Sequence, residues 1–231
     1  MTRHHCWIVG GSAAVVIALM SLPLSIVLPV ALPVESGIAA RSAEGSVWRG
    51  VLREVNIAGL PVGDTGVALR VLPLLVGEAR LGFGAPALRG TLVASSGSVG
   101  LLDATGTVDL AGRLRPLPLT RFNLDAVTTE FRDDRCTTAR GRVRAEIAGD
   151  VGGLMLPGGM SGTVRCDGVY LVLPLVGQSG MERIDLRVAA SGKWRADLSI
   201  RTTDPTISGR LLSSGFASGP GGYTIRVSGA L

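Results

Sequence analysis

A two-residue alternation of apolar and polar side chains runs through several stretches in the second half of the chain. In residues 139–147 (ARGRVRAEI), Val143 and Ala145 fall on one face, and the three arginines Arg140, Arg142 and Arg144 fall on the other. The same period recurs in residues 183–188, 194–201 and 223–228. This period is typical of antiparallel strands with one buried and one solvated face.

Short turn sequences separate these runs, at residues 95–97, 103–106, 191–193 and 219–222. No segment after Val34 shows a helical period over three turns. The pattern therefore predicts an all-β domain over residues 43–231, folded as an antiparallel, meander-like curved sheet or as a sandwich.

Two segments of this region echo each other: residues 66–77 (GVALRVLPLLVG) and residues 168–177 (GVYLVLPLVG). Each combines a strand, a proline and a short apolar step, and charged alternation follows both. The echo suggests two related halves, about 43–118 and 132–231. Chance similarity in a chain so rich in Leu, Val and Gly is the alternative.

The N-terminal region has a different pattern, because no charged residue occurs from Cys6 to Val34. A bilayer core about 30 Å thick requires about 20 apolar residues in a helix. Residues 7–28 meet this requirement and predict a transmembrane helix, with a cytoplasmic tail at 1–6 and a linker at 29–42. Arg3 favours a cytoplasmic N-terminus.

A cleaved secretory signal is the alternative for this apolar run. The hydrophobic region of a signal peptide is usually about 7–15 residues long, and this run is about twice that length. We therefore expect an uncleaved, single-pass anchor in the cell inner membrane. Under either interpretation the β domain is exported, and we expect it in the periplasm.

The formal charge of +5 could indicate an anionic partner, but the basic residues are spread singly along the chain and Lys193 is the only lysine. A nucleic-acid surface would need clustered charge and aromatic residues that stack on bases. Aromatic residues make up only 4% of the chain. The sequence thus favours solvated strand faces over a nucleic-acid partner.

The residues needed for common enzyme chemistry are missing from the predicted β domain. Both histidines, His4 and His5, precede the apolar run, so the commonest general base and metal ligand are absent from the exported part. Asp133 and Asp134 adjoin arginines and are interpreted as a solvated turn. We expect no enzyme activity, no cofactor, no bound metal and no small-molecule substrate.

The three cysteines are Cys6, Cys136 and Cys166. Cys6 lies on the cytoplasmic side of the predicted helix, whereas the other two are exported. Two thiols in an oxidising compartment indicate a disulfide between Cys136 and Cys166. Two buried free thiols are the alternative.

The most specific motif is residues 44–50 (EGSVWRG), which follow the N-terminal anchor directly. Together with residues 67–77 (VALRVLPLLVG), 106–114 and 222–231, this motif resembles the N component of type II secretion systems, also called general secretion pathway protein N. The resemblance implies a bitopic inner-membrane protein that supports export of folded proteins across the outer membrane. Its partners would be other platform subunits of the inner membrane, with the secretin as a further candidate.

Within that motif, Gly45, Val47, Trp48 and Gly50 are the candidate functional residues. Trp48 could anchor a partner. Alternatively, it pins the first strand to the core, which we favour because exported aromatic residues are scarce. A different function is also open: a membrane-anchored lipid-handling protein whose curved sheet forms an apolar groove lined by Leu69, Val71, Leu81 and Leu92.

Overall fold

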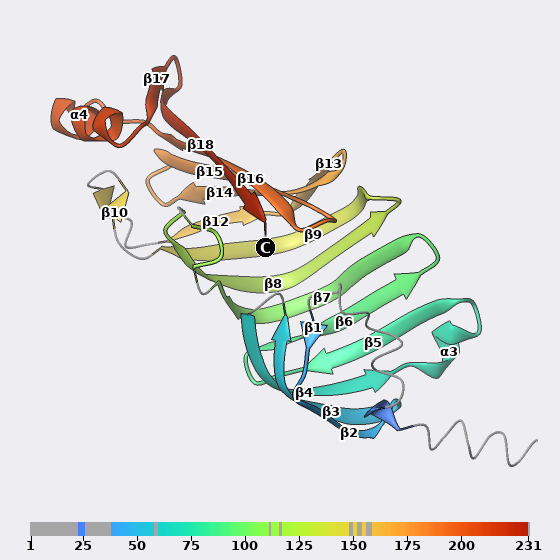
Figure 1. Ribbon diagram of the computed structural model, residues 1–231. Coiled ribbons are helices and arrows are strands. Elements are labelled where there is room, and N and C mark those ends of the chain that lie inside the picture. Colours follow the sequence, from blue (N-terminus) through green and yellow to red (C-terminus); the bar gives the residue numbers. More distant parts are fainter. Residues whose placement is uncertain are drawn as a thin grey trace, which may run out of the picture. The chain divides into compact units, whose positions relative to one another are not determined.

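The computed structural model describes residues 23–25, 38–57, 60–110, 112–115, 117–147, 150–151, 154–155 and 159–230 (Figure 1). The fold is all-β with an open antiparallel sheet, which confirms the predicted class. The chain divides into two compact units, Met1–Pro86 and Ala87–Leu231. We call them the first and the second unit.

The described residues of the first unit form five strands and one short helix. Their bounds are β1 (Ile38–Ala39), β2 (Ser42–Ser46), β3 (Arg49–Ile57), β4 (Leu60–Leu69), α3 (Val71–Leu74) and β5 (Glu78–Gly84). β3 pairs with β4 on one side and with both β1 and β2 on the other, and β4 pairs with β5. A small apolar core lies beneath these strands, built from Leu24, Val47, Leu52, Val55 and Val67.

Only residues 23–25 of the predicted membrane span are described, and Pro23 and Leu24 contact other residues of the first unit. Pro23 forms an isolated antiparallel bridge with Ser46, and Leu24 is 5% exposed within the core of this unit. No helix among the described residues is long and apolar enough to cross a membrane. The rest of the predicted span, 7–28, lies outside the described residues. β1 falls within the predicted linker, 29–42.

In the second unit, the part that the structure describes forms thirteen strands and one helix. Their bounds are β6 (Leu88–Ser95), β7 (Ser98–Asp109), β8 (Leu119–Arg132), β9 (Arg135–Ile147), β10 (Asp150–Val151), β11 (Leu154–Met155), β12 (Met160–Thr163), β13 (Arg165–Asp167), β14 (Tyr170–Gly177), β15 (Glu182–Ala189), β16 (Lys193–Ile200), α4 (Pro205–Ser213), β17 (Ala217–Gly219) and β18 (Gly222–Ala230). Hydrogen-bonded neighbours follow the order β6-β7-β8-β9-β12-β14-β15-β16-β18-β17, β13 adds to β14, and β10 pairs with β11 alone.

The predicted alternation accounts for the core of the second unit. Val143 and Ala145 of β9 are buried, whereas Arg142 and Arg144 beside them are exposed. The buried faces of β7–β9 and β14–β16 belong to one apolar cluster, which also includes Trp194 of β16. Because these faces share one core, the sheet of this unit must curl over its own apolar side.

Bulges in the long strands explain this curvature. The ladder between β7 and β8 shifts on both sides of Ala104, and the ladder between β8 and β9 shifts between Asp125 and Thr128. Asp103 and Ala126 have positive φ angles of 50° and 47° at these shifts. A bulge bends its strand and increases its twist, so neighbouring bulges in β7 and β8 curve the sheet along one line.

The two compact units are divided between Pro86 and Ala87, whereas the predicted related halves are residues 43–118 and 132–231, and their relation stays a prediction. The predicted boundary, between residues 118 and 132, is occupied by β8, which pairs with β7 and β9. The two echoing segments also differ in structure. Residues 71–74 form the helix α3, whereas the corresponding residues around Pro174 lie within strand β14.

Candidate functional site

The motif at residues 45–50 forms a tight hairpin between β2 and β3. Ser46 pairs with Arg49, so Val47 and Trp48 make the turn. Val47 is 4% exposed within the core of the first unit, and the half-buried Trp48 packs against that core. Trp48 therefore connects the turn to the core, and its role as an anchor for a partner stays a prediction.

The two glycines of the motif meet different requirements of this hairpin. Gly45 has a positive φ of +87°, a conformation that other residues adopt at a cost. A Cβ on Gly50 would lie 2.7 Å from Cδ2 of Leu24 and 2.8 Å from the carbonyl oxygen of Glu44. Because Gly50 has no side chain, Leu24 from the N-terminal apolar run can pack in this space.

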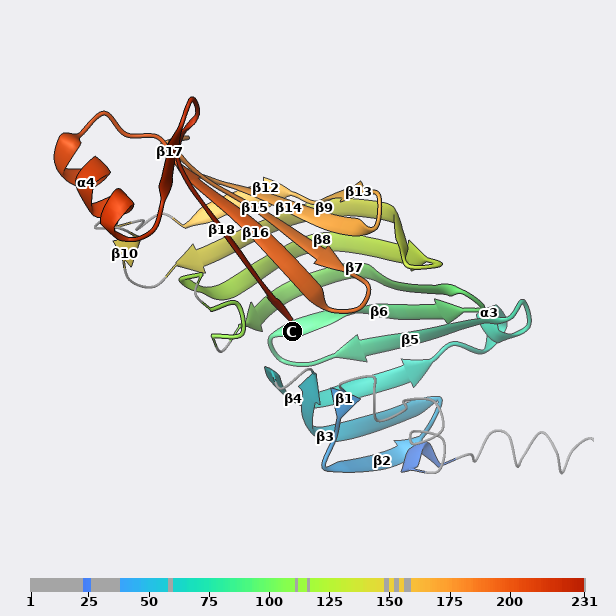
Figure 2. The ribbon, with the colours of Figure 1, turned by 45° about the horizontal axis from the view of Figure 1, so that its top comes forward.

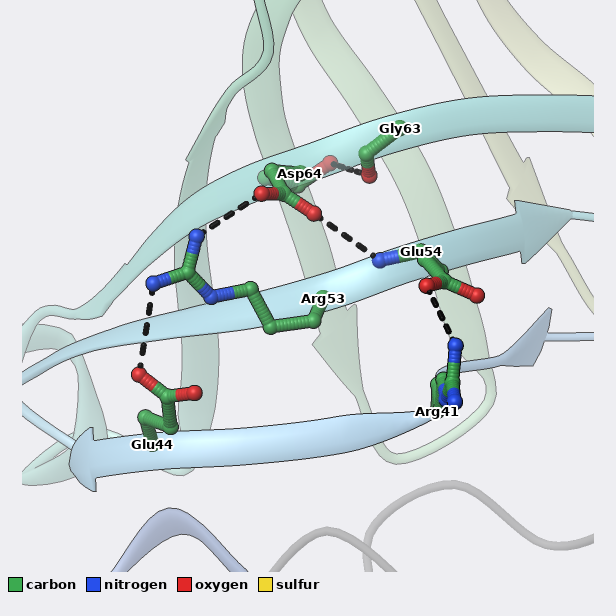
Figure 3. Close-up of polar contacts among 7 residues, drawn as sticks. Arg41, Glu44, Arg53, Glu54, Gly63 and Asp64 are labelled. Carbon is green, nitrogen blue, oxygen red and sulfur yellow. Dashed lines mark hydrogen bonds and ion pairs between the residues drawn. The ribbon is translucent and has the colours of Figure 1, made fainter.

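Charged side chains on β2, β3 and β4 form a continuous network (Figure 3). The Arg53 guanidinium donates to Asp64 Oδ2 at 2.8 Å and to Glu44 Oε2 at 3.4 Å. Asp64 Oδ1 accepts from the backbone N–H of Glu54 at 3.1 Å, and Arg41 donates to Glu54 at 2.8 Å.

These contacts change the acid–base behaviour of two members of the network. The hydrogen bond from Arg53, followed by the backbone hydrogen bond from Glu54, lowers the pKa of Asp64. The hydrogen bond to Asp64, followed by that to Glu44, raises the pKa of Arg53. The network has three carboxylates and two guanidinium groups, and it holds the β-bulge at Glu54, whose φ is +50°.

The loop between β4 and β5 is the most apolar exposed segment among the described residues. It carries five of the nine large hydrophobic side chains that are exposed there: Val71 (48%), Leu72 (78%), Leu74 (38%), Leu75 (79%) and Val76 (80%). None of the residues of α3 is buried. We call residues 71–76 the apolar loop. In the sequence, this loop corresponds to the proline and the short apolar step at the end of residues 66–77.

The four residues predicted to line a lipid groove do not share one environment. Leu69 and Leu81 are cross-strand neighbours on β4 and β5, and both are half-buried. Val71 belongs to the exposed apolar loop. Leu92 lies in the second unit, where it pairs with Leu101.

The disulfide between Cys136 and Cys166 is present, as predicted. It joins β9 to β13 with a Cα–Cα distance of 5.3 Å, within the usual range for a bridge. The backbone N–H of Cys136 also donates to the carbonyl oxygen of Gly168 at 3.1 Å. The bridge fixes the short strand β13 beside the long hairpin of β8 and β9.

The last strand of the second unit presents a partly open edge. β18 pairs with β16 along residues 223–230, whereas β17 covers its other side only at residues 222–224. Among the described strands, none pairs with residues 225–230 on that outer side. An open edge of this kind can accept a strand from another chain through main-chain hydrogen bonds.

The described residues contain no group of three or more His, Cys, Asp or Glu side chains that could hold a metal ion. Asp133 and Asp134 form the exposed turn between β8 and β9, with φ angles of 48° and 61°. Positive φ at both central residues is the geometry of a two-residue hairpin turn. The positions of Asp133 and Asp134 are therefore explained by the backbone conformation of this turn.

Comparison with known protein families identifies a match over most of the chain. The model of the family described as type II secretion system (T2SS), protein N, matches residues 36–226. The matched region includes the hairpin at residues 45–50, the apolar loop, both cysteines of the disulfide and most of β18. No curated protein and no solved structure matches the chain.

Proposed function

The chain belongs to the type II secretion system protein N family, and from this premise we propose that it is a non-catalytic inner-membrane subunit of the type II secretion pathway. In this role it supports the export of folded proteins across the outer membrane through contacts with other subunits. The family match over residues 36–226 is the observation that carries the proposal.

The proposed topology is a cytoplasmic N-terminus, one membrane span and a periplasmic β domain. The uncharged run from Cys6 to Val34 supports the span. The disulfide between Cys136 and Cys166 supports an oxidising compartment for the second unit, because such bonds are rare in reducing cytosol.

The open edge of β18 supports action by protein contacts. Strand addition at a sheet edge gives affinity through the main chain, and side chains on the two faces then give specificity. β18 offers the half-buried Ile225 and Val227 on one face and the exposed Arg226 and Ser228 on the other. The partners we propose are the other platform subunits of the inner membrane, and the secretin is a further candidate.

The lipid-handling alternative receives less support from the second unit. A lipid groove requires an apolar sheet face that is left open. The apolar face of this unit is instead filled by its own side chains, among them Leu119, Leu175 and Ile184, which are at most 2% exposed.

Site-specific photocrosslinking in cells that contain the whole pathway tests the proposal. A photoreactive amino acid replaces Ser228 on the open edge, and the control replaces Arg142, which is exposed in the middle of the paired strand β9. We expect crosslinks to a platform subunit or the secretin from position 228 and none from position 142. Crosslinks to lipid alone from position 228 would overturn the proposal.

A further inference from the structure

The apolar loop of the first unit is exposed without an evident structural reason. Its side chains contribute nothing to the core of that unit, since α3 contains no buried residue. Between Arg70 and Glu78 the chain carries no charge. Contiguous exposed apolar side chains of this kind mark a site of interaction with a protein or a membrane.

The loop lies at the same end of the first unit as the described residues 23–25 of the N-terminal apolar run. Pro23 bridges to Ser46, the last residue of β2. The next residue, Val47, accepts a hydrogen bond from the backbone N–H of Leu69 at 3.1 Å, two residues before the loop begins. Figures 1 and 2 both show α3 and the dark blue segment near residue 24 toward the same ends of β2 and β4.

The burial of Leu24 also limits where a membrane span can end. A side chain that is 5% exposed in the core of the first unit is not in contact with lipid. The span would therefore end near Leu22. This end lies before residue 28, the end predicted from the sequence pattern.

The residues around this end suit the boundary between lipid and water. Trp48 lies at the hairpin turn beside the exposed Arg49, and the exposed Arg70 immediately precedes the loop. Neither arginine forms an ion pair with a described residue. Aromatic and basic residues are enriched where proteins meet lipid headgroups.

We propose that the apolar loop, residues 71–76, inserts into the periplasmic leaflet of the same bilayer that holds the N-terminal anchor. The first unit is then fixed to the membrane at two points, the anchor and the loop. This inference rests on the membrane anchoring in the proposed function. The position of the loop at the end of the first unit where Pro23 pairs with Ser46 favours lipid over an apolar surface of a partner protein.

Fluorescence quenching in vesicles tests the proposal with the full chain. The background variant Cys6→Ser leaves Cys136 and Cys166 in their disulfide, so a single new cysteine can be labelled with an environment-sensitive dye. Leu75→Cys reports on the loop, and Val99→Cys, also exposed (55%), is the matched control in the second unit. Ile17→Cys reports on the predicted anchor. The vesicles contain phosphatidylethanolamine and phosphatidylglycerol, with or without bromine on the acyl chains.

We expect brominated lipid to quench the dye at positions 75 and 17 and to leave the dye at position 99 unchanged. A dye at position 75 that stays exposed to water would overturn the proposal. A dye that is shielded from water but is not quenched by brominated lipid would also overturn it, and would indicate a contact with protein. If position 17 is also not quenched, the anchoring itself is wrong and the proposed function fails. The two failures are thus distinguishable.

A second pair of variants tests the chemistry of insertion. With the dye at Val76→Cys, Leu72→Glu places a charge in the loop, and Leu72→Ala shortens the same side chain without charge. Because Leu72 is 78% exposed, neither change removes a core contact. We expect Leu72→Glu to abolish most of the quenching and Leu72→Ala to retain most of it. Equal quenching in the two variants would contradict insertion.

Discussion

Asp103, Ala126 and Glu54 each hold a positive φ at or beside a shift in strand register. Neighbouring polar groups stabilise these positions. The buried Thr128 Oγ1 accepts from the N–H of Asp103 at 3.1 Å, and Asp64 accepts from the N–H of Glu54. Specific hydrogen bonds thus stabilise backbone conformations that would be strained in isolation. Single residues therefore determine where the strands β3, β7 and β8 bend.

Gly50 gives the sharpest residue-scale prediction. Gly50→Ala adds a methyl group within 2.9 Å of the carbonyl oxygens of Glu44 and Ser46. Because these backbone atoms cannot move away freely, we expect the first unit to lose about 1–3 kcal/mol of stability. Hydrogen–deuterium exchange of β2 and β3 in increasing denaturant measures this loss.

The matched control for that change is Gly84→Ala in β5. No heavy atom lies within 4 Å of a Cβ at this position, and its φ is not in the left-handed region. We expect the stability of the first unit, measured by this exchange, to be unchanged or to rise by at most about 1 kcal/mol. Equal destabilisation by both substitutions would show that crowding at Gly50 is not the cause.

Asp64 gives a prediction about pH. Its folded-state pKa is lowered mainly by the hydrogen bond from Arg53. The stabilisation is therefore fully present above the pKa of the unfolded state and is lost as pH falls through the folded-state pKa. We expect Asp64→Asn to lower the denaturation midpoint of the first unit at pH 7 and to have a much smaller effect near pH 3.

Asp167→Asn is the control for this measurement, because Asp167 is exposed and forms no ion pair among the described residues. Its effect should be small at both values of pH. If Asp64→Asn lowers the denaturation midpoint of the first unit equally at pH 7 and at pH 3, the charge of Asp64 does not stabilise the fold.

At the scale of elements, periodicity predicted β9, β15, β16 and β18 and the side on which each is buried, because these strands have one wet face. Periodicity did not distinguish the two echoing segments, residues 66–77 and 168–177, which have similar apolar sequences but different structures. Pro174 fits inside β14 because β12 and β13 leave the ladder interrupted between Val172 and Val176, where the missing N–H of proline costs nothing. Pro73 does not lie in a strand of the sheet; it lies in the helix α3. Such long-range pairing cannot be read from local sequence.

The helix α4 could have been found from the sequence. Asp204 caps it by accepting from the N–H groups of Thr206 and Ile207 at 2.7 and 3.4 Å, and Pro205 occupies its first turn. An acidic cap followed by proline is a signal for the start of a helix. Its short length and the interior Gly209 concealed the period. The hairpin motif at residues 45–50 was identified, whereas the exposure of the apolar loop depended on tertiary structure.

The disulfide gives the prediction at this scale. Cys136 and Cys166 are 30 positions apart, and closing a loop of that size stabilises a fold by about 3–4 kcal/mol. We expect the double variant Cys136→Ser/Cys166→Ser to lose stability of this size in urea unfolding of the second unit. Reductant should have the same effect on the wild-type chain.

Cys6→Ser serves as the control, since it leaves the bridge intact and should not change the unfolding of either unit. Reductant should not affect the double variant further. A wild-type chain that unfolds at the same urea concentration with and without reductant would contradict a stabilising role for the bridge.

For the whole molecule, the two units carry different features. The first unit has a small core, receives Leu24 from the N-terminal run and exposes the apolar loop. The second unit has the larger core, the disulfide and the open edge of β18. Our proposals therefore assign membrane attachment to the first unit and contacts with other subunits to the second.

The proposed topology makes Cys6 the only free thiol and places it on the cytoplasmic side. In intact spheroplasts a membrane-impermeant maleimide should not label the wild-type chain, because Cys136 and Cys166 are bonded to each other. Permeabilisation should add one label, which Cys6→Ser removes. Reduction of intact spheroplasts should add two labels, which the double serine variant removes. A label on Cys6 before permeabilisation would place the N-terminus outside the cytoplasm, and a chain that gains no label after it would show that the leader is cleaved.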